Sequence, residues 1–282
     1  MKTVLITGSS SGFGLDMVRD FLNSDYRVIA TLRNASERKE LFQEFLPNDN
    51  LVIKNLDVTV REDQRKIAEY IEAELAGELD LLINNAGYGV YGALEDVTEN
   101  QIRDQFEVNF FGATFLIQEL LPFLRRRKGK IINISSVMGR FSMPLGSIYS
   151  ASKYAIEGLT EGLYYELKAQ GVQITSIEPG GHRTGFVKAV VWGEKSHHEN
   201  SLYKNETRGL VGLMERLSLR KNAPSSRNIS QLALKLAKKN QLPRRVLIGN
   251  DARATGLMQK ILPESWYHFF MSKGFKSLLK GA

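Results

Sequence analysis

The chain has 282 residues, of which 43% are hydrophobic and 24% charged, values that are ordinary for a globular protein with a substantial core. It contains no cysteine, which excludes disulfides, thiolate metal sites and a cysteine nucleophile. The net charge of +7 is unevenly spread, because residues 185–282 carry 18 Lys and Arg against 6 Asp and Glu, whereas residues 1–184 carry a net −5.

Short β-branched runs alternate with stretches of helical spacing along the chain. The runs that we expect to form strands are Val4–Thr7, Tyr26–Thr31, Leu51–Leu56, Leu79–Ile83, Lys130–Ile134, Val172–Ile177 and Arg245–Ile248. The stretches that we expect to form helices are 14–24, 36–46, 60–76, 98–125 and 148–170. Because the strand runs lack polar alternation, they predict strands buried on both faces. The alternation predicts an α/β protein with a doubly wound parallel sheet of about seven strands and helices on both faces.

The first strand run begins at residue 4. This leaves no room for the charged and apolar regions of a signal peptide. No stretch approaches the ~20 apolar residues of a membrane-spanning helix. We therefore expect a cytoplasmic protein.

A turn rich in glycine and serine, TGSSSGFG at residues 7–14, follows this first strand. In parallel α/β sheets, ligands bind at the carboxyl ends of the strands. Glycines there let the backbone approach phosphate oxygens, and the following helix offers unpaired amides at the positive end of its dipole. The turn therefore predicts a dinucleotide site, for which the expected contacts are Gly8, Ser10, Ser11, Gly12, Phe13 and Gly14.

The end of the second strand bears on which dinucleotide is bound. NAD-binding sites usually carry an acidic residue here, which accepts a hydrogen bond from the ribose 2′-hydroxyl. This chain has Leu32 at that place and Arg33 directly after it. A guanidinium attracts a 2′-phosphate that a carboxylate would repel. The sequence therefore favours NADP(H) over NAD(H), with Arg33 as a solvated surface residue the alternative.

The stretch YSASK places Tyr149 and Lys153 four residues apart at the start of an expected helix, and hence on one face. A free tyrosine has a pKa of ~10. A cation ~6 Å away at an effective dielectric of ~20 contributes roughly 2.8 kcal/mol, about two pKa units. We therefore expect Lys153 to lower the pKa of Tyr149 into a range useful for acid/base catalysis.

Other polar residues accompany this pair. Ser136 ends the strand run before it, and its hydroxyl is placed to bond a substrate oxygen. NNAG at 84–87 ends the fourth strand with two amides and little bulk. Asn109 is a polar residue in an apolar helical stretch, where a satisfied core amide is an equally good interpretation.

These motifs, together with PGGHRT at 179–184, occur in the order and spacing of the short-chain dehydrogenase/reductase family, which residues 3–184 closely resemble. The pattern is similar to its compact branch, which carries TGxxxGxG and YxxxK motifs. The resemblance implies a Rossmann fold in which residues 1–282 form a single oxidoreductase domain. Residues 185–228 would then form a substrate-loop insertion, and about 250–282 a helical extension at the C-terminus.

The resemblance also implies roles for individual residues. Tyr149 would be the acid/base, Lys153 would lower its pKa and hold the nicotinamide ribose, and Ser136 would steady the substrate oxygen. Asn109 would maintain a proton relay. Further cofactor contacts implied in this way are Asp57, Val58, Asn85, Ala86, Gly87, Pro179, Gly180 and Thr184.

Within the family, ATLRN and the C-terminal tail look similar to the 17β-hydroxysteroid and retinol dehydrogenase-like group. This implies an NADP(H)-dependent oxidoreductase acting on an apolar alcohol or carbonyl compound. His182 and Arg183 depart from that group and weigh against a steroid-like substrate. The alternative function is a cofactor-binding regulatory or scaffold protein with little turnover.

The C-terminal segment 263–282 interleaves aromatic residues with lysines. That composition suits a helix on an anionic membrane, and equally a helix that covers the pocket or a subunit interface. The resemblance implies a homodimer or homotetramer formed through 98–125 and 148–170. We expect no nucleic-acid partner, for which only the basic charge speaks, and no metal site, because His197 and His198 lack further ligands at a suitable spacing.

Overall fold

The protein is described here from a computed structural model. The structure describes residues 1–181, 187, 189–219 and 224–280. Thr184, expected at the cofactor, lies outside the described residues, as do His182 and Arg183.

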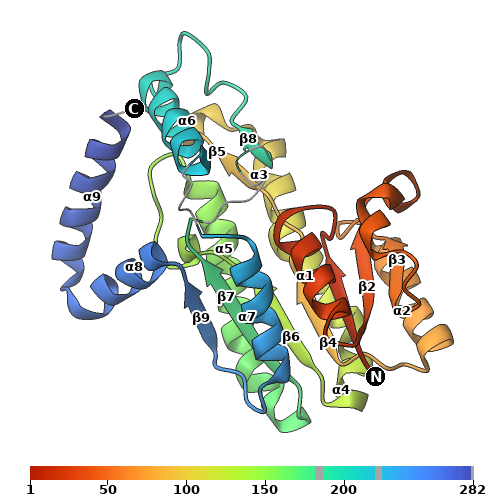
Figure 1. The fold of residues 1–282 in the computed structure, drawn as a ribbon. Coiled ribbons are helices and arrows are strands. Elements are labelled where there is room, and N and C mark those ends of the chain that lie inside the picture. The colour runs from red at the N-terminus through yellow and green to blue at the C-terminus, as the bar shows by residue number, and fades with distance from the viewer. Residues whose placement is uncertain (182–186, 188, 220–223, 281–282) are drawn as a thin grey trace.

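A seven-stranded, wholly parallel sheet forms the centre of the molecule (Figure 1), in the order β3-β2-β1-β4-β6-β7-β9. The strands are β1 (Lys2–Thr7), β2 (Tyr26–Leu32), β3 (Leu51–Asn55), β4 (Leu81–Asn84), β6 (Lys130–Ile134), β7 (Gln173–Pro179) and β9 (Arg245–Ile248). The order reverses direction between β1 and β4, so their carboxyl ends border the position where an α/β sheet binds its ligand. The predicted fold class is confirmed.

Helices cover both faces of this sheet. Alternate side chains of β1 separate the two layers, because Val4 and Ile6 pack on one side and Leu5 on the other. The Val4 side is covered by α1 (Gly12–Leu22), α7 (Arg227–Lys238) and a 3₁₀ segment η1 (Ala35–Phe45). The Leu5 side is covered by α2 (Arg61–Leu75), α4 (Ala113–Arg127) and α5 (Ser147–Glu166).

Two of the expected helices differ from the prediction. The stretch 36–46 forms the 3₁₀ turns of η1 with a non-helical break at Arg38, so an α-helix there was wrong. The stretch 98–125 is divided into α3 (Glu99–Phe106), a π-helical turn η3 (Glu107–Gly112) and α4. A Cβ at Gly112 would lie 2.8 Å from a methyl of Val58, so the helix can pass this loop only with a glycine there.

A second, two-stranded sheet was not foreseen. It pairs β5 (Gly89–Tyr91) in parallel with β8 (Val190–Trp192), which belongs to the predicted insertion. The side-chain amide of Gln101 donates to the carbonyl of Trp192 at 2.9 Å and joins this sheet to α3. Strands of three residues are too short to show a period in the sequence.

The remaining elements lie beyond the carboxyl edge and at the C-terminus, except η5, which leads from α5 to the start of β7. They are η2 (Leu94–Asp96), η4 (Val137–Gly139), η5 (Lys168–Gln170), α6 (Lys204–Leu219), α8 (Asn250–Ile261) and α9 (Glu264–Lys280). Helix α9 packs against α6, and in Figure 1 it stands at the outer left edge of the molecule. Among the helices of the described part of the chain, none is long and apolar enough to cross a bilayer.

Candidate active site

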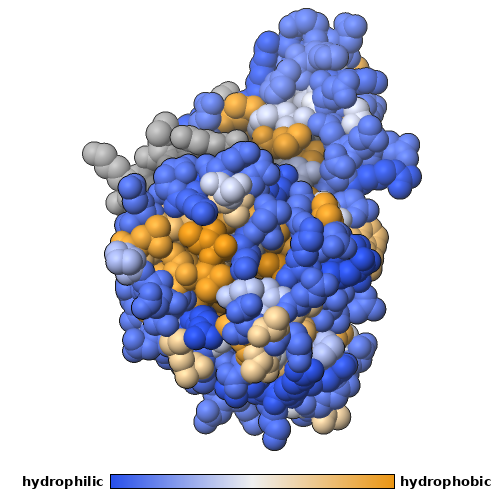
Figure 2. Space-filling model, turned by 90° about the vertical axis from the view of Figure 1, so that its right-hand side faces the viewer, coloured by the Kyte–Doolittle hydropathy of each residue, from blue (hydrophilic) through white to orange (hydrophobic). Residues whose placement is uncertain are grey.

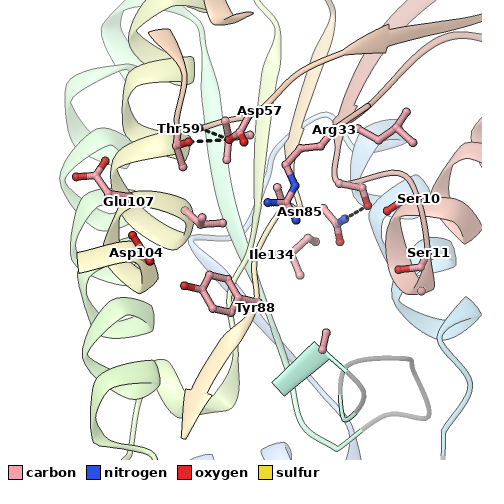
Figure 3. A pocket seen from close by; sticks show the side chains of 18 of the residues that line it. Ser10, Ser11, Arg33, Asp57, Thr59, Asn85, Tyr88, Asp104, Glu107 and Ile134 are labelled. Carbon is pink, nitrogen blue, oxygen red and sulfur yellow. Dashed lines mark hydrogen bonds between the residues drawn. The ribbon is translucent and has the colours of Figure 1, made fainter. Parts of the chain in front are cut away.

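A cleft of about 950 Å³ lies at the carboxyl ends of β1, β2, β4 and β6. Its walls come from the turn after β1, the ends of β2 and β4, the loop after β3 and the start of α5 (Figure 3). Ala189, Val190 and Val191 close it on the side of the insertion. On the face shown in Figure 2, hydrophobic side chains gather in a patch on the body of the molecule.

The turn after β1 is held close to the end of β4. Gly8 has a φ of +66°, and a Cβ on it would lie 2.8 Å from the Cα of Ala86. The amide of Asn85 donates to the carbonyls of Thr7 and Gly8 at 2.9 and 3.0 Å. Asn85 therefore fixes the turn in addition to bordering the cleft.

Gly14 lies within α1, behind the turn. A Cβ on it would come within 2.2 Å of the carbonyl oxygen of Gly8. It does not line the cleft, unlike the other five residues expected in this motif: Gly8, Ser10, Ser11, Gly12 and Phe13. Gly14 thus supports the turn from behind, where only a hydrogen atom fits between helix and turn, and its direct contact with the cofactor stays a prediction.

The turn has the properties of a seat for phosphate groups. Helix α1 begins at Gly12, so its unpaired amides and positive dipole end are directed at the cleft. Gly8 and Gly12 have positive φ, which lets the backbone curve without a side chain in the way. The residues present thus fit the pyrophosphate of a dinucleotide.

At one end of the cleft, Arg33 reaches inward from the end of β2 (Figure 3). Arg38, which the sequence did not single out, lines the same cleft. Asp57 is bonded to the backbone amide and the hydroxyl of Thr59 at 2.9 and 2.7 Å. This end of the cleft therefore presents two guanidinium groups and one held carboxylate.

At the other end, Tyr149 and Lys153 rise side by side from the first turns of α5, and both are buried. The Lys153 Nζ lies 5.8 Å from the centre of the Tyr149 ring and donates to the carbonyl of Ile134 at 3.0 Å. Ser136 is buried beside them, and its hydroxyl accepts from the backbone amide of Met138 at 3.1 Å.

Burial dominates the acid–base properties of this pair. It raises the pKa of Tyr149 to about 12, against which a hydrogen bond with Ser136 acts in the opposite direction. It lowers the pKa of Lys153 to about 8, against which the carboxyl of Glu157 acts. The expected lowering of the phenol pKa by the lysine is not what this structure shows, because both groups lose hydration and each neutral form is favoured.

Asn109 lies in the π-helical turn next to this pair. Its side-chain oxygen accepts from the amide of Tyr88 at 3.1 Å, and its nitrogen donates to the Tyr88 carbonyl and to the Ser152 hydroxyl at 3.0 and 3.1 Å. A Cβ on Gly87 would meet both the Asn109 oxygen, at 3.0 Å, and the Lys153 nitrogen, at 3.7 Å. The amide is therefore satisfied locally and is also next to the lysine.

A cluster of apolar side chains packs around Tyr149 on the side of the second sheet. The Tyr91 ring stacks on that of Tyr149 with centres 5.5 Å apart, and Trp192 lies 6.2 Å from Tyr91. The other residues of this cluster are Ala93, Val137, Met138, Phe141, Met143, Leu145, Val190, Leu210, Leu213, Met214, Leu247 and Ala252. The side chains packed beside the phenol of Tyr149 are thus mostly aromatic and aliphatic.

The remaining predicted contacts divide into two groups. Val58, Ala86 and Gly87 line the cleft with Asp57 and Asn85. Pro179 and Gly180 do not. Gly180 donates its amide to Ile248 at 2.9 Å, and a Cβ there would collide with the carboxyl of Asp251.

Several lining residues were missed by the sequence analysis: Arg38, Thr59, Tyr88, Gln101, Asp104, Glu107, Val108, Ser135, Ala189, Val190 and Val191. Tyr88 directly follows NNAG and was within reach of the motif. Thr59, Val108 and Ser135 likewise adjoin predicted site residues. The others come from segments without a pattern of their own, and only the fold brings them to the cleft.

Known proteins resemble this chain over most of its length. Residues 2–195 match the family described as short chain dehydrogenase. A probable short-chain type dehydrogenase/reductase of Helicobacter pylori is 32% identical over 265 residues, which are 93% of this chain and 94% of that protein. Retinol dehydrogenase 8 of Homo sapiens is 38% identical over 192 residues, 66% of this chain and 60% of that protein.

Solved structures share the fold. A short-chain dehydrogenase from Streptomyces avermitilis superposes with a TM-score of 0.80 at 32% identity, covering 97% of this chain and 98% of that one. The closed form of a serine dehydrogenase complexed with NADP+ superposes with a TM-score of 0.73 at 26% identity, covering 87% and 94%.

Proposed function

Because the chain belongs to the short-chain dehydrogenase/reductase family and is therefore an NAD(P)-dependent oxidoreductase, we propose that it transfers hydride between NADP(H) and an apolar alcohol or carbonyl compound. The observation that carries the proposal is the position of Tyr149 and Lys153 in one continuous cleft with the glycine turn. A proton-transfer group and a dinucleotide seat thus share one cavity.

The nicotinamide supplies or accepts the hydride when it is bound, and the protein residues handle the proton and the geometry. Tyr149 donates its phenolic proton to the oxygen of a carbonyl substrate, or takes it from an alcohol. Ser136, bonded to Tyr149, steadies the same oxygen. The ammonium of Lys153 stabilises the phenolate that forms, and Asn109 orients the neighbouring backbone.

The cofactor would lie along the cleft from Arg33 to Lys153. Gly8, Ser10, Ser11, Gly12 and Phe13 would seat its pyrophosphate, with Gly14 behind them. The adenosine would lie between Arg33 and Asp57, with Val58 beside it, and the nicotinamide near Asn85, Ala86 and Gly87. The resemblance also implies Pro179, Gly180 and Thr184 at the nicotinamide end, although Pro179 and Gly180 lie outside the lining of the described cleft.

Preference for NADP(H) rests on charge at one end of the cleft. Arg33 and Arg38 both line it there, and two guanidinium groups suit a 2′-phosphate better than a neutral ribose. The serine dehydrogenase among the structural neighbours was solved with NADP+, which supports the same choice.

An apolar substrate is supported by the aromatic and aliphatic side chains that pack around Tyr149, of which Val190 also lines the cleft. Retinol dehydrogenase 8, among the relatives, has by its name an apolar alcohol as substrate. Each additional buried methylene contributes ~0.8 kcal/mol, so kcat/KM should rise about threefold or more per CH₂ along a series of aliphatic aldehydes. We propose that residues 185–228 shape the substrate end of the cleft, within one domain formed by residues 1–282.

Two copies would associate through α4 and α5. The ring of Phe115 on α4 stacks on that of Phe111 in the preceding turn η3, with centres 5.8 Å apart, and Tyr154 and Tyr165 are exposed on α5. Such a face suits a homodimer, or a homotetramer if a second face is used. Light scattering of the intact chain measures the number of copies.

The deciding experiment is oxidation of NADPH and NADH, followed at 340 nm, with a panel of apolar aldehydes and ketones. Tyr149→Phe removes only the transferable proton and is expected to lower kcat by about a hundredfold or more. Tyr165→Phe, an exposed tyrosine on the same helix, is the matched control and should behave like the unchanged protein. Tight cofactor binding without Tyr149-dependent turnover would instead favour the regulatory or scaffold function.

A further inference from the structure

Helix α9 is attached to the body of the protein by one side. Tyr267 on that side is only 4% exposed. The Phe275 ring lies stacked against that of Phe141 with centres 6.4 Å apart. The helix also packs on α6. The inner face of α9 is thus already occupied by the rest of the chain.

The opposite side of α9 is aromatic as well. Trp266, Phe269 and Phe270 are 61%, 52% and 46% exposed, and their spacing of three and four residues places them on one face. The neighbouring helix α8 exposes Leu257 and Ile261. A helix that is apolar on both sides is ordinarily covered on both, so this outer face lacks a partner.

Basic residues accompany these side chains. Residues 253–280 contain five Lys and Arg against one Asp or Glu. The ammonium of Lys273 lies 4.4 Å from the centre of the Phe269 ring, so a cation and an aromatic ring share the outer face. We propose that the outer face of α8 and α9, defined by Leu257, Ile261, Trp266, Phe269, Phe270 and Lys273, docks on an anionic lipid bilayer.

Charge distinguishes this occupant from a second copy of the chain. A two-fold contact between two such faces would bring the positive charge of Lys273 against the same basic face of the other copy, which is unfavourable. An anionic bilayer attracts each Lys or Arg near its surface by about 1 kcal/mol. Tryptophan and phenylalanine also favour the boundary between headgroups and acyl chains.

The inner face of α9, opposite the docking face, lies against the apolar cluster that contains Tyr149. Phe141, on which α9 rests through Phe275, belongs to the apolar cluster around Tyr149. A bilayer on the outer face of α9 would therefore hold a store of apolar molecules on the far side of the helix that packs against this cluster. This last consequence rests on the proposed function, whereas the docking itself does not.

The test is flotation of the intact chain with vesicles, without substrate or cofactor. Vesicles of phosphatidylcholine mixed with phosphatidylglycerol should retain at least about tenfold more protein than phosphatidylcholine alone, and added salt should release it. Trp266→Ala/Phe269→Ala/Phe270→Ala should reduce binding to the anionic vesicles by more than about tenfold. Leu94→Ala/Leu202→Ala, two leucines exposed elsewhere, is the matched control and should bind normally.

Other results would overturn the docking. These are equal binding to neutral vesicles, no binding, or unchanged binding of the triple variant. A triple variant that dissociates an oligomer, when neither form binds vesicles, would assign the face to a second copy. Unchanged NADPH affinity and melting temperature show that the triple variant is folded. Because flotation involves no turnover, failure of the reaction and failure of the docking are separate results.

Discussion

At the scale of single residues, Tyr149 and Lys153 owe their chemistry to burial. With a pKa of about 12, the phenol stays protonated at neutral pH and is ready to act as the acid in carbonyl reduction. With a pKa of about 8, the lysine is still mostly charged at pH 7, but a small rise in pH removes that charge. The positive charge that would stabilise a phenolate is thus the first of the two to be lost as the pH rises.

This gives a pH dependence for the reduction. We expect kcat to be level near pH 7 and to fall above pH 8, because Lys153 then loses its proton while Tyr149 keeps its own. Stopped-flow reduction rates across this range measure it. Lys168→Met, which removes an exposed lysine near the end of α5, should leave the profile unchanged. A level profile up to pH 10 would contradict the assignment to Lys153.

A second buried group stands one helical turn behind the lysine. Glu157 accepts from the Ser176 hydroxyl at 3.0 Å and lies near the fully buried Glu178. Arg245 approaches the carboxyls of both, at 3.8 and 3.7 Å. Burial and the neighbouring carboxylate together raise the pKa of Glu157 to about 7.

The protonation of Glu157 should be visible in stability. Its pKa is higher in the folded than in the unfolded chain, so this stabilisation is complete below about pH 4.5 and is lost as the pH rises through about 7. Glu157→Gln keeps the shape without ionising. We therefore expect its free energy of unfolding to decline less between pH 5 and 8 than that of the unchanged protein. Urea denaturation at these pH values measures the difference, with the exposed Glu166→Gln as control.

At the scale of elements, the turn after β1 and helix α1 form one tightly packed unit. Two helical glycines show how local this constraint is. A Cβ on Gly14 would come within 2.2 Å of a backbone carbonyl, whereas a Cβ on Gly158 in α5 would meet nothing within 4 Å. The same substitution should therefore have opposite effects at the two positions.

Gly14→Ala should displace the turn, raise the Kd for NADPH by tenfold or more, and destabilise the fold by roughly 1–3 kcal/mol. Gly158→Ala should leave NADPH binding unchanged and stabilise the fold by roughly 0.5–1 kcal/mol, because alanine favours a helix over glycine. Calorimetric titration and urea unfolding of both variants test this pair. Normal cofactor affinity in Gly14→Ala would refute the packing argument.

The π-helical turn is the other element on which the site depends. It turns Asn109 toward both the backbone of Tyr88 and the Ser152 hydroxyl. If α3 continued as a regular α-helix, the side chain of Asn109 would point in another direction, because a π-helical hydrogen bond spans one residue more than an α-helical one. The π-helical turn thus lets Asn109 hold the backbone of Tyr88 in place beside the cleft.

At the scale of the whole molecule, cofactor binding should be linked to global stability. A ligand present at 100 times its Kd stabilises the folded state by about 2.7 kcal/mol, which raises the melting temperature by several degrees in a chain of this size. We expect a clear shift with NADPH and a smaller one with equal NADH.

Arg33→Ala should remove most of that difference, because it removes a charged partner of the 2′-phosphate and should weaken NADPH binding about tenfold or more. Arg27→Ala, at the opposite end of the same strand, is the matched control. Differential scanning fluorimetry of the three proteins is sufficient. Equal shifts with NADH and NADPH in the unchanged protein would argue against the preference.

The sequence by itself determined the sheet, its parallel order and the place of the cofactor cleft. Strands buried on both faces are continuous apolar runs, and a phosphate site needs glycines at fixed positions. Both features can therefore be recognised in a short stretch of sequence. Tyr149 and Lys153 were singled out because helical spacing places them on one face, and the structure buries Ser136 beside them.

Only the tertiary structure decided the rest. Gly14 proved to support the turn from behind, Arg38 to join Arg33, and Glu157 to stand buried behind Lys153. The second sheet, which brings the insertion to the cleft, consists of strands too short to have a period. Burial also reversed the expected direction of the Tyr149 pKa. Each of these depends on what surrounds a residue in space, and spacing along the chain does not encode that environment.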